Sequence, residues 1–178
     1  MTTWVALLRG VNVGGITIRN ADLVALFQDT LGFHDVRTYL ASGNVRFETD
    51  AAAGRRDPLK ASIEAGLRER FGYDAWIVLV TLTELVRAVE GFPYDASDAA
   101  RQPWVIFCVD MATRDELAAA AASLDPAVDP AAAGPGVVYW NPVKGSTTDT
   151  PFAKILAKAT YKSRTTNRNL RTLAKIAS

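Results

Sequence analysis

Residues 36–48 have the sequence VRTYLASGNVRFE, and this stretch decides the fold. Ser42, Gly43 and Asn44 separate two runs that contain apolar residues, and hairpin turns favour Gly and Asn. After the turn, apolar and polar side chains alternate over residues 45–48, which indicates a strand with one buried and one solvated face. The stretch therefore predicts a β-hairpin.

One strand and one helix are expected on each side of this hairpin. Upstream, the apolar run at residues 4–8 predicts a buried strand, and residues 20–31 predict a helix that begins at Asn20. Downstream, apolar residues recur every fourth position within 57–71 and predict a second helix, which residues 75–80 follow as a buried strand. The order β-α-β-β-α-β is the split βαβ pattern of ferredoxin-like domains, with two helices on one face of an antiparallel sheet.

The second half of the chain predicts a degenerate copy of this unit. A helix that opens with a capping box at Thr81 and Glu84 ends near residue 91, and residues 92–103 form the expected linker. Apolar periodicity and helix-start signals then predict a strand at 104–109, a helix opened by a capping box at 113–116, a loop at 125–136, a strand at 137–140, a helix from 151 and a helix at 167–176.

The expected fold class is therefore α+β, a tandem of two ferredoxin-like subdomains with antiparallel sheets plus a C-terminal helix. The first subdomain is expected at residues 1–91, including the helix that follows its last strand. The second, with the basic C-terminal helix, is expected at residues 92–178.

The composition limits the setting in which the protein works. Hydrophobic residues make up 49% of the chain, an ordinary share for a globular protein. Cys108 is the single cysteine, so no internal disulfide can form and a reducing compartment is favoured. The sequence carries no export signal and no apolar window long enough for a membrane span. We therefore expect a cytoplasmic protein with no membrane partner.

The net charge of +1 conceals an uneven distribution of basic residues. Residues 151–178 contain no acid and carry a charge of +7, against −6 for the remainder of the chain. The basic residues of this segment are Lys154, Lys158, Lys162, Arg164, Arg168, Arg171 and Lys175. The segment therefore predicts either a surface for an anionic partner or a surface that faces the acidic part of the protein itself.

Three motifs make the chain resemble a known bacterial family. They are ALLRGVNVGG at 6–15, LGFHDVRTYLASGNVRF at 31–47 and TNRNLRT at 166–172. With these motifs the chain is similar to the domain-of-unknown-function family DUF1697. The resemblance implies a tandem of two ferredoxin-like units and supplies no established activity, substrate or cofactor. Members often carry Lys where this chain has Ile16, and Trp where it has Leu170.

The glycine-rich loop at residues 9–15, after the first strand, is one candidate for ligand binding. Its glycines can expose backbone N–H groups that cradle an anion. The phosphate-binding lysine of a P-loop is missing, because Ile16 and Thr17 follow the last glycine, and the spacing does not match a dinucleotide-binding fingerprint. A left-handed turn with no ligand is the alternative interpretation.

The last motif supplies a second set of candidates. Thr166 is expected to be a helix N-cap, and the cations that follow it either form a solvated helix face or bind a ligand. We expect the polar motifs of the chain to converge on one pocket. The candidate ligand-binding residues are Arg9, Asn12, Gly14, Gly15, Ser42, Asn44, Thr166, Arg168 and Asn169.

No catalytic residue, metal site or cofactor is predicted. His34 has no nucleophile or acid at a triad-like spacing, and Cys108 lies in an apolar run. The sequence favours a protein that binds an anionic ligand, either a phosphorylated small molecule or a nucleic acid, without catalysis. One alternative is an enzyme that holds a small anionic substrate between Arg9 and Arg168 as electrostatic clamps; another is a protein-interaction scaffold. The sequence does not define the oligomeric state.

Overall fold

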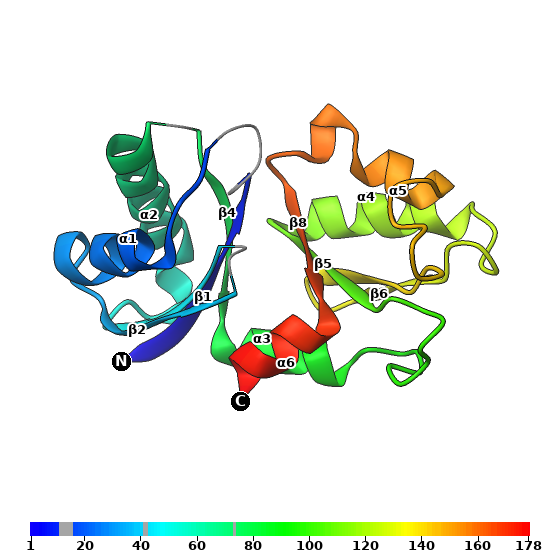
Figure 1. Cartoon of the computed structure of the whole chain (residues 1–178), viewed down its shortest axis with the longest axis horizontal. Coiled ribbons are helices and arrows are strands. Elements are labelled where there is room, and N and C mark those ends of the chain that lie inside the picture. Colours follow the sequence, from blue (N-terminus) through cyan, green and yellow to red (C-terminus); the bar gives the residue numbers. More distant parts are fainter. Residues whose placement is uncertain (11–15, 41–42, 73) are drawn as a thin grey trace. The chain divides into compact units, whose positions relative to one another are not determined.

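Each half of the chain folds around a four-stranded antiparallel sheet, as the computed structural model shows (Figure 1). The structure describes residues 1–10, 16–40, 43–72 and 74–178. The chain divides into two units, Met1–Leu85 and Val86–Ser178. This division lies inside helix α3 (Leu82–Glu90), and the boundary expected between residues 91 and 92 stays a prediction.

Unit 1 has the ferredoxin-like order of elements that its sequence predicts. Its elements are β1 (Thr2–Arg9), α1 (Asn20–Ala25), the π-helical turn η1 (Leu26–Thr30), β2 (His34–Tyr39), β3 (Asn44–Thr49), the short 3-10 helix η2 (Ala53–Arg55), α2 (Arg56–Phe71) and β4 (Trp76–Thr81). The strands lie in the order β2-β3-β1-β4, so β1 is paired on both sides. The hairpin at residues 36–48 is confirmed, because β2 and β3 pair antiparallel.

The core of unit 1 lies between its sheet and helices α1 and α2. Trp4, Ala6 and Leu8 of β1 point into it, since side chains alternate along a strand. Phe27 and Phe47 meet there edge to face, with ring centroids 5.3 Å apart. This packing identifies one sheet face as the core face and leaves alternate residues on the other.

Unit 2 repeats the same topology. Its elements after α3 are β5 (Trp104–Cys108), α4 (Met111–Ala122), β6 (Ala131–Gly134), β7 (Val137–Trp140), α5 (Pro151–Leu156), the 3-10 helix η3 (Ala159–Tyr161), β8 (Thr165–Asn169) and α6 (Leu170–Ala177). The strand order β6-β7-β5-β8 corresponds strand by strand to that of unit 1. The fold is therefore a tandem of two ferredoxin-like units with a C-terminal helix. Among the described residues, no helix is both long and apolar enough to cross a membrane.

Three expectations for unit 2 are wrong in detail. Residues 131–134 form strand β6 rather than part of a loop, because β7 supplies their hydrogen-bond partners. Helix α4 begins earlier than predicted: the carboxylate of Asp110 accepts from the backbone N–H of Thr113 at 2.7 Å, which makes Asp110 the N-cap. Thr166 lies within β8 and not at a helix start; Asn169 caps α6 instead.

The side chain of Tyr139 holds helix α3 to the sheet of unit 2. Its hydroxyl donates to the carbonyl of Ala88 at 2.7 Å. Its ring lies so close to two glycines that a Cβ atom would be 2.7 Å from the hydroxyl oxygen at Gly91 and 2.4 Å from a ring carbon at Gly134. The packing therefore requires glycine on both sides of this tyrosine.

A buried carboxylate joins three segments of the same unit. Asp129 is 2% exposed, and its two oxygens accept from the indole Nε1 of Trp140 at 3.0 Å and from the backbone N–H of Phe152 at 3.1 Å. The loop before β6 is thereby tied to β7 and to the start of α5. Both carboxylate oxygens are needed, because each accepts a hydrogen bond from a different donor.

We expect Asp129→Asn to lower the free energy of unfolding by about 1–3 kcal/mol, because the amide nitrogen cannot accept a hydrogen bond and leaves one buried donor unpaired. Urea denaturation followed by tryptophan fluorescence measures this loss. Asp115→Asn is the control, since the Asp115 side chain is 67% exposed and its replacement should change stability little. Equal stability of the Asp129 variant and the wild-type protein would contradict the prediction.

Candidate functional site

The candidate residues of unit 1 share one face of its sheet. We call the sheet face turned away from α1 and α2, or in unit 2 from α4 and α5, the opposite face. Trp4, Ala6 and Leu8 point toward the helices, so Arg9 at the end of β1 belongs to the opposite face. Burial lowers the pKa of Arg9, because loss of water disfavours a charged guanidinium.

Asn44 lies on the same face, next to the end of β1. It is the register partner of Leu7, which is two residues before Arg9, and its side chain is fully buried. The amide Nδ2 of Asn44 donates to the carbonyl of Tyr39 at 2.9 Å. The backbone N–H of Leu8 donates to the carbonyl of Gly43 at 2.8 Å, which ties the hairpin turn to β1. The structure thus brings Arg9 and Asn44 to one end of one sheet face.

Four of the predicted ligand residues lie outside the described residues, namely Asn12, Gly14, Gly15 and Ser42. The anion cradle proposed for the glycine-rich loop therefore stays a prediction. The described part of this loop begins with Gly10, whose φ of +81° is a conformation that side-chain-bearing residues rarely adopt.

The candidate residues of unit 2 lie on β8. Thr166 and Arg168 pair in register with Phe107 and Val105, whose neighbours in β5 point into the core beneath α4 and α5. Thr166 and Arg168 therefore lie on the opposite face of their sheet, and both are buried. The Nη1 atom of Arg168 donates to the hydroxyl of Thr166 at 2.6 Å and to the carbonyl of Asn167 at 2.9 Å. These bonds hold the guanidinium in one orientation.

Asn169, the last predicted ligand residue, has a structural role. Its side-chain oxygen accepts from the backbone N–H of Arg171 at 3.0 Å and caps helix α6. The cap places the start of α6 directly after β8. Whether Asn169 also contacts a ligand stays a prediction.

Sequence reasoning missed Arg46 as a candidate. It follows Asn44 by two residues in β3, so it lies on the same opposite face, where its register partner is Val5. The alternation over residues 45–48 had indicated a solvated face there, yet Val5 and Leu7 are fully buried on that face. The signal was present in β1, whose unbroken apolar run predicts burial on both sides.

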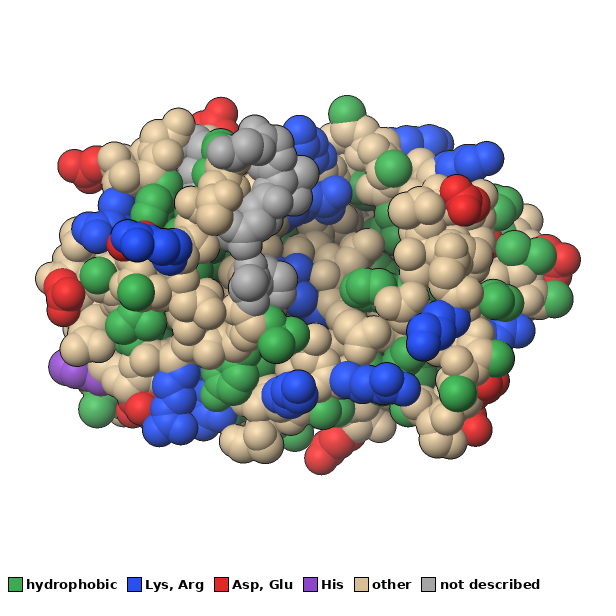
Figure 2. All heavy atoms as spheres, viewed as in Figure 1, with side chains coloured by type: hydrophobic (Ala, Val, Ile, Leu, Met, Phe, Trp, Pro, Cys, Tyr) green, Lys and Arg blue, Asp and Glu red, His purple; other side chains and the backbone are tan. Residues whose placement is uncertain are grey.

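The C-terminal basic segment is part of the folded unit and not a flexible extension. The guanidinium of Arg164 donates to the carboxylate of Glu116 at 2.8 Å and to the hydroxyl of Thr113 at 3.0 Å. On the visible face, Lys and Arg side chains lie in several small groups with other residues between the groups (Figure 2). Part of the +7 charge of residues 151–178 therefore forms contacts within unit 2 itself.

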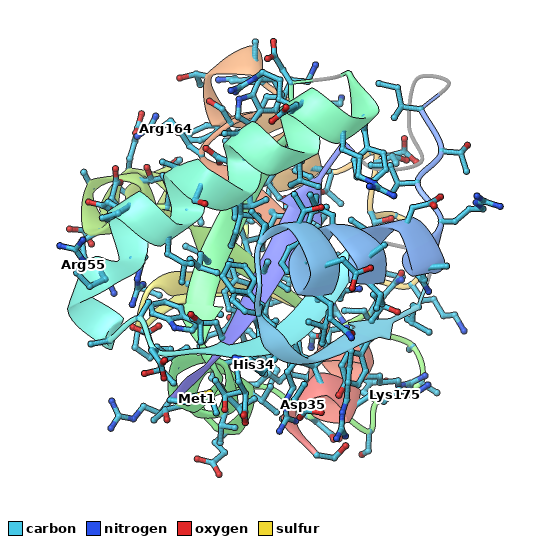
Figure 3. The ribbon with its side chains drawn as sticks, turned by 90° about the vertical axis from the view of Figure 1, so that its left-hand side faces the viewer. Met1, His34, Asp35, Arg55, Arg164 and Lys175 are labelled. Atoms are coloured by element: carbon cyan, nitrogen blue, oxygen red, sulfur yellow. The ribbon has the colours of Figure 1, made fainter. Side chains whose placement is uncertain are left out.

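The titratable side chains His34 and Cys108 lie in different units. His34 is exposed at the start of β2, where Figure 3 labels it beside Asp35, and its register partner is Glu48. Over the described ranges, no group of three His, Cys, Asp or Glu residues could hold a metal ion. Cys108 is buried in β5.

Fold and site together define a two-unit ferredoxin-like α+β protein with an arginine on the opposite face of each sheet, half-buried Arg9 in unit 1 and buried Arg168 in unit 2. The chain belongs to the family described as "Protein of unknown function (DUF1697)", whose model matches residues 1–139. This match includes Arg9 and Asn44 and ends before β8.

One solved structure shares the complete fold. It is that of a conserved bacterial protein from Streptococcus pneumoniae, with a TM-score of 0.79 and 23% sequence identity. The alignment covers 99% of this chain and 97% of that chain. At this identity the likeness concerns the fold alone. A comparison with curated proteins finds no match.

We expect the thiol of Cys108 to be unreactive in the native protein. Burial, with a smaller contribution from the Asp110 carboxylate, raises its pKa from 9.0 to about 12. The thiolate fraction at about pH 8 then falls roughly a thousandfold. Ellman's reagent should label the native chain very slowly and the chain in guanidinium chloride at once, and rapid native labelling would contradict this.

Proposed function

We propose that the protein binds a phosphorylated small molecule, without catalysis, through Arg168 on the opposite face of the unit 2 sheet. The observation that carries the proposal is Arg168, which is 8% exposed and whose guanidinium is oriented by Thr166 and Asn167. A buried cation held in one orientation loses little entropy when an anion arrives. The planar guanidinium also matches the oxygens of a phosphate group.

Unit 1 supports the proposal with a similar arrangement. Arg9 lies near the fully buried amide of Asn44 on the opposite face of its own sheet. In both units, an arginine thus shares its sheet face with a neutral hydrogen-bonding side chain, Asn44 in unit 1 and Thr166 in unit 2.

The same faces favour a small molecule over a nucleic acid. Ferredoxin-like sheets that bind RNA stack bases on exposed aromatic side chains. Here Phe107 and Tyr139, the aromatic residues of β5 and β7 on the opposite face, are buried. A buried arginine also contacts a compact anion more readily than an extended phosphate backbone.

We expect Arg168→Gln to weaken binding of pyrophosphate by about tenfold or more, the loss typical of a charge-assisted hydrogen bond. Isothermal titration calorimetry measures the affinity. Arg171→Gln is the matched control, because it removes the same charge from an exposed position on α6 and should leave affinity nearly unchanged.

Arg168→Lys extends the test, since it keeps the charge and loses the planar fork, so its affinity should lie between those of the wild type and Arg168→Gln. Thermal unfolding shows which variants are folded. Absence of pyrophosphate binding to the wild-type protein, or equal losses in the Arg168 and Arg171 glutamine variants, would refute the proposal. A scaffold would instead show self-association in light scattering across a concentration series.

A further inference from the structure

Three exposed lysines follow one another along the segment that joins α4 and β7 of unit 2 to its last strand. Lys154 lies in α5, Lys158 lies between α5 and η3, and Lys162 directly follows η3. We call these three side chains the lysine ridge. The backbone N–H of Lys158 donates to the carbonyl of Ile155 at 3.1 Å. That of Lys162 donates to the carbonyl of Ala159 at 3.2 Å, so only one tight turn separates each lysine from the next.

Apolar side chains of the same segment fix the ridge on the folded unit. Phe152, Leu156 and Tyr161 are buried in the core of unit 2, beneath the lysines. The three lysines, in contrast, are exposed. The segment therefore displays its charges from a packed surface and not from a flexible tail, which reduces the entropy lost when an anionic partner binds.

The charge of the ridge is not balanced within its own segment. Residues 150–178 contain no acid, and the acid that precedes them, Asp149, accepts from the hydroxyl of Thr148. Arg164 is paired with Glu116, but none of the ion pairs of the described residues includes Lys154. A group of like charges on a fixed surface attracts a partner that carries several negative charges.

The side chains between the lysines favour a nucleic acid as this partner. Thr160 and Ser163 are exposed, and proteins contact DNA phosphates with lysine, serine and threonine side chains. Residues 157–163, all of which the structure describes, expose no aromatic or large apolar side chain, since Tyr161 is buried. Insertion into a lipid surface, stacking of single-stranded bases and anchoring of a protein partner all depend on such side chains.

We propose that the lysine ridge docks the phosphate backbone of double-stranded DNA without reading its sequence. The ridge belongs to the layer of α4 and α5, whereas Arg168 lies on the opposite face of the sheet, so this site is separate from that of the proposed function. Each neutralised phosphate releases counterions, so binding through three lysines is weak and decreases steeply as salt is added.

Fluorescence anisotropy of a labelled DNA duplex of about 20 base pairs, titrated at several salt concentrations, tests this inference. Replacing both Lys154 and Lys158 by Gln should weaken binding about five- to tenfold at low salt and reduce the slope of log K against log salt by about 2. The matched control replaces Arg171 and Lys175 by Gln. These two are also exposed and four residues apart, and Figure 3 shows Lys175 far from Arg164, which lies two residues after the ridge.

The ridge variant should lose much more affinity for the duplex than the control variant, and thermal unfolding checks that both are folded. Equal losses in the two variants, or no binding of the duplex to the wild-type protein at low salt, would overturn the inference. Tighter binding to phosphatidylserine vesicles or to polyglutamate than to the duplex would also overturn it. The ridge variant should keep the wild-type affinity for pyrophosphate, so the two proposals fail or survive independently.

Discussion

The register of the central strands, β1 in unit 1 and β5 in unit 2, is the constraint on which the rest of the structure depends. Each is hydrogen-bonded on both sides, so its alternation assigns every neighbouring side chain to one of two faces. Helices cover one face, and Trp4, Ala6 and Leu8 complete that core. A slip of β1 by one residue would exchange its two faces and move Arg9 beneath α1 and α2. Strand pairing, and not the local sequence, therefore decides on which face of the sheet these polar side chains lie.

Buried polar groups perform different tasks in this framework. Asp129 joins a loop, a strand and a helix with two hydrogen bonds, and Asn44 closes a hairpin turn with its amide group. Both belong to the set of interactions that define a unique fold, because an unpaired buried donor is costly. Arg168 differs from them: its bonds to Thr166 and Asn167 are local along β8 and determine the direction of a charged group.

The sequence predicts unit 1 well, because its helices and strands carry strong local signals. Unit 2 is harder to predict where pairing overrides those signals. Residues 131–134 are Ala-Ala-Ala-Gly, which have little preference for a strand and form β6 only because β7 lies beside them. Residues 165–169 are polar and lack periodicity, yet pairing with β5 makes them a strand. For the site, polar residues at strand ends identified Arg9 and Asn44. Arg46 was missed because the alternation around it resembled that of a surface strand, although the apolar run of β1 indicated burial on both faces of the sheet.

The fit of Tyr139 between Gly91 and Gly134 has a consequence for how this unit can diverge. A methyl group at position 134 cannot be accommodated while the aromatic ring is present, and a smaller residue at 139 would leave a void beside both glycines. The three positions are thus mutually dependent. Homologues in which one of them differs should show compensating exchanges at the others, so this trio offers a marker for following the lineage of the second ferredoxin-like unit independently of any ligand.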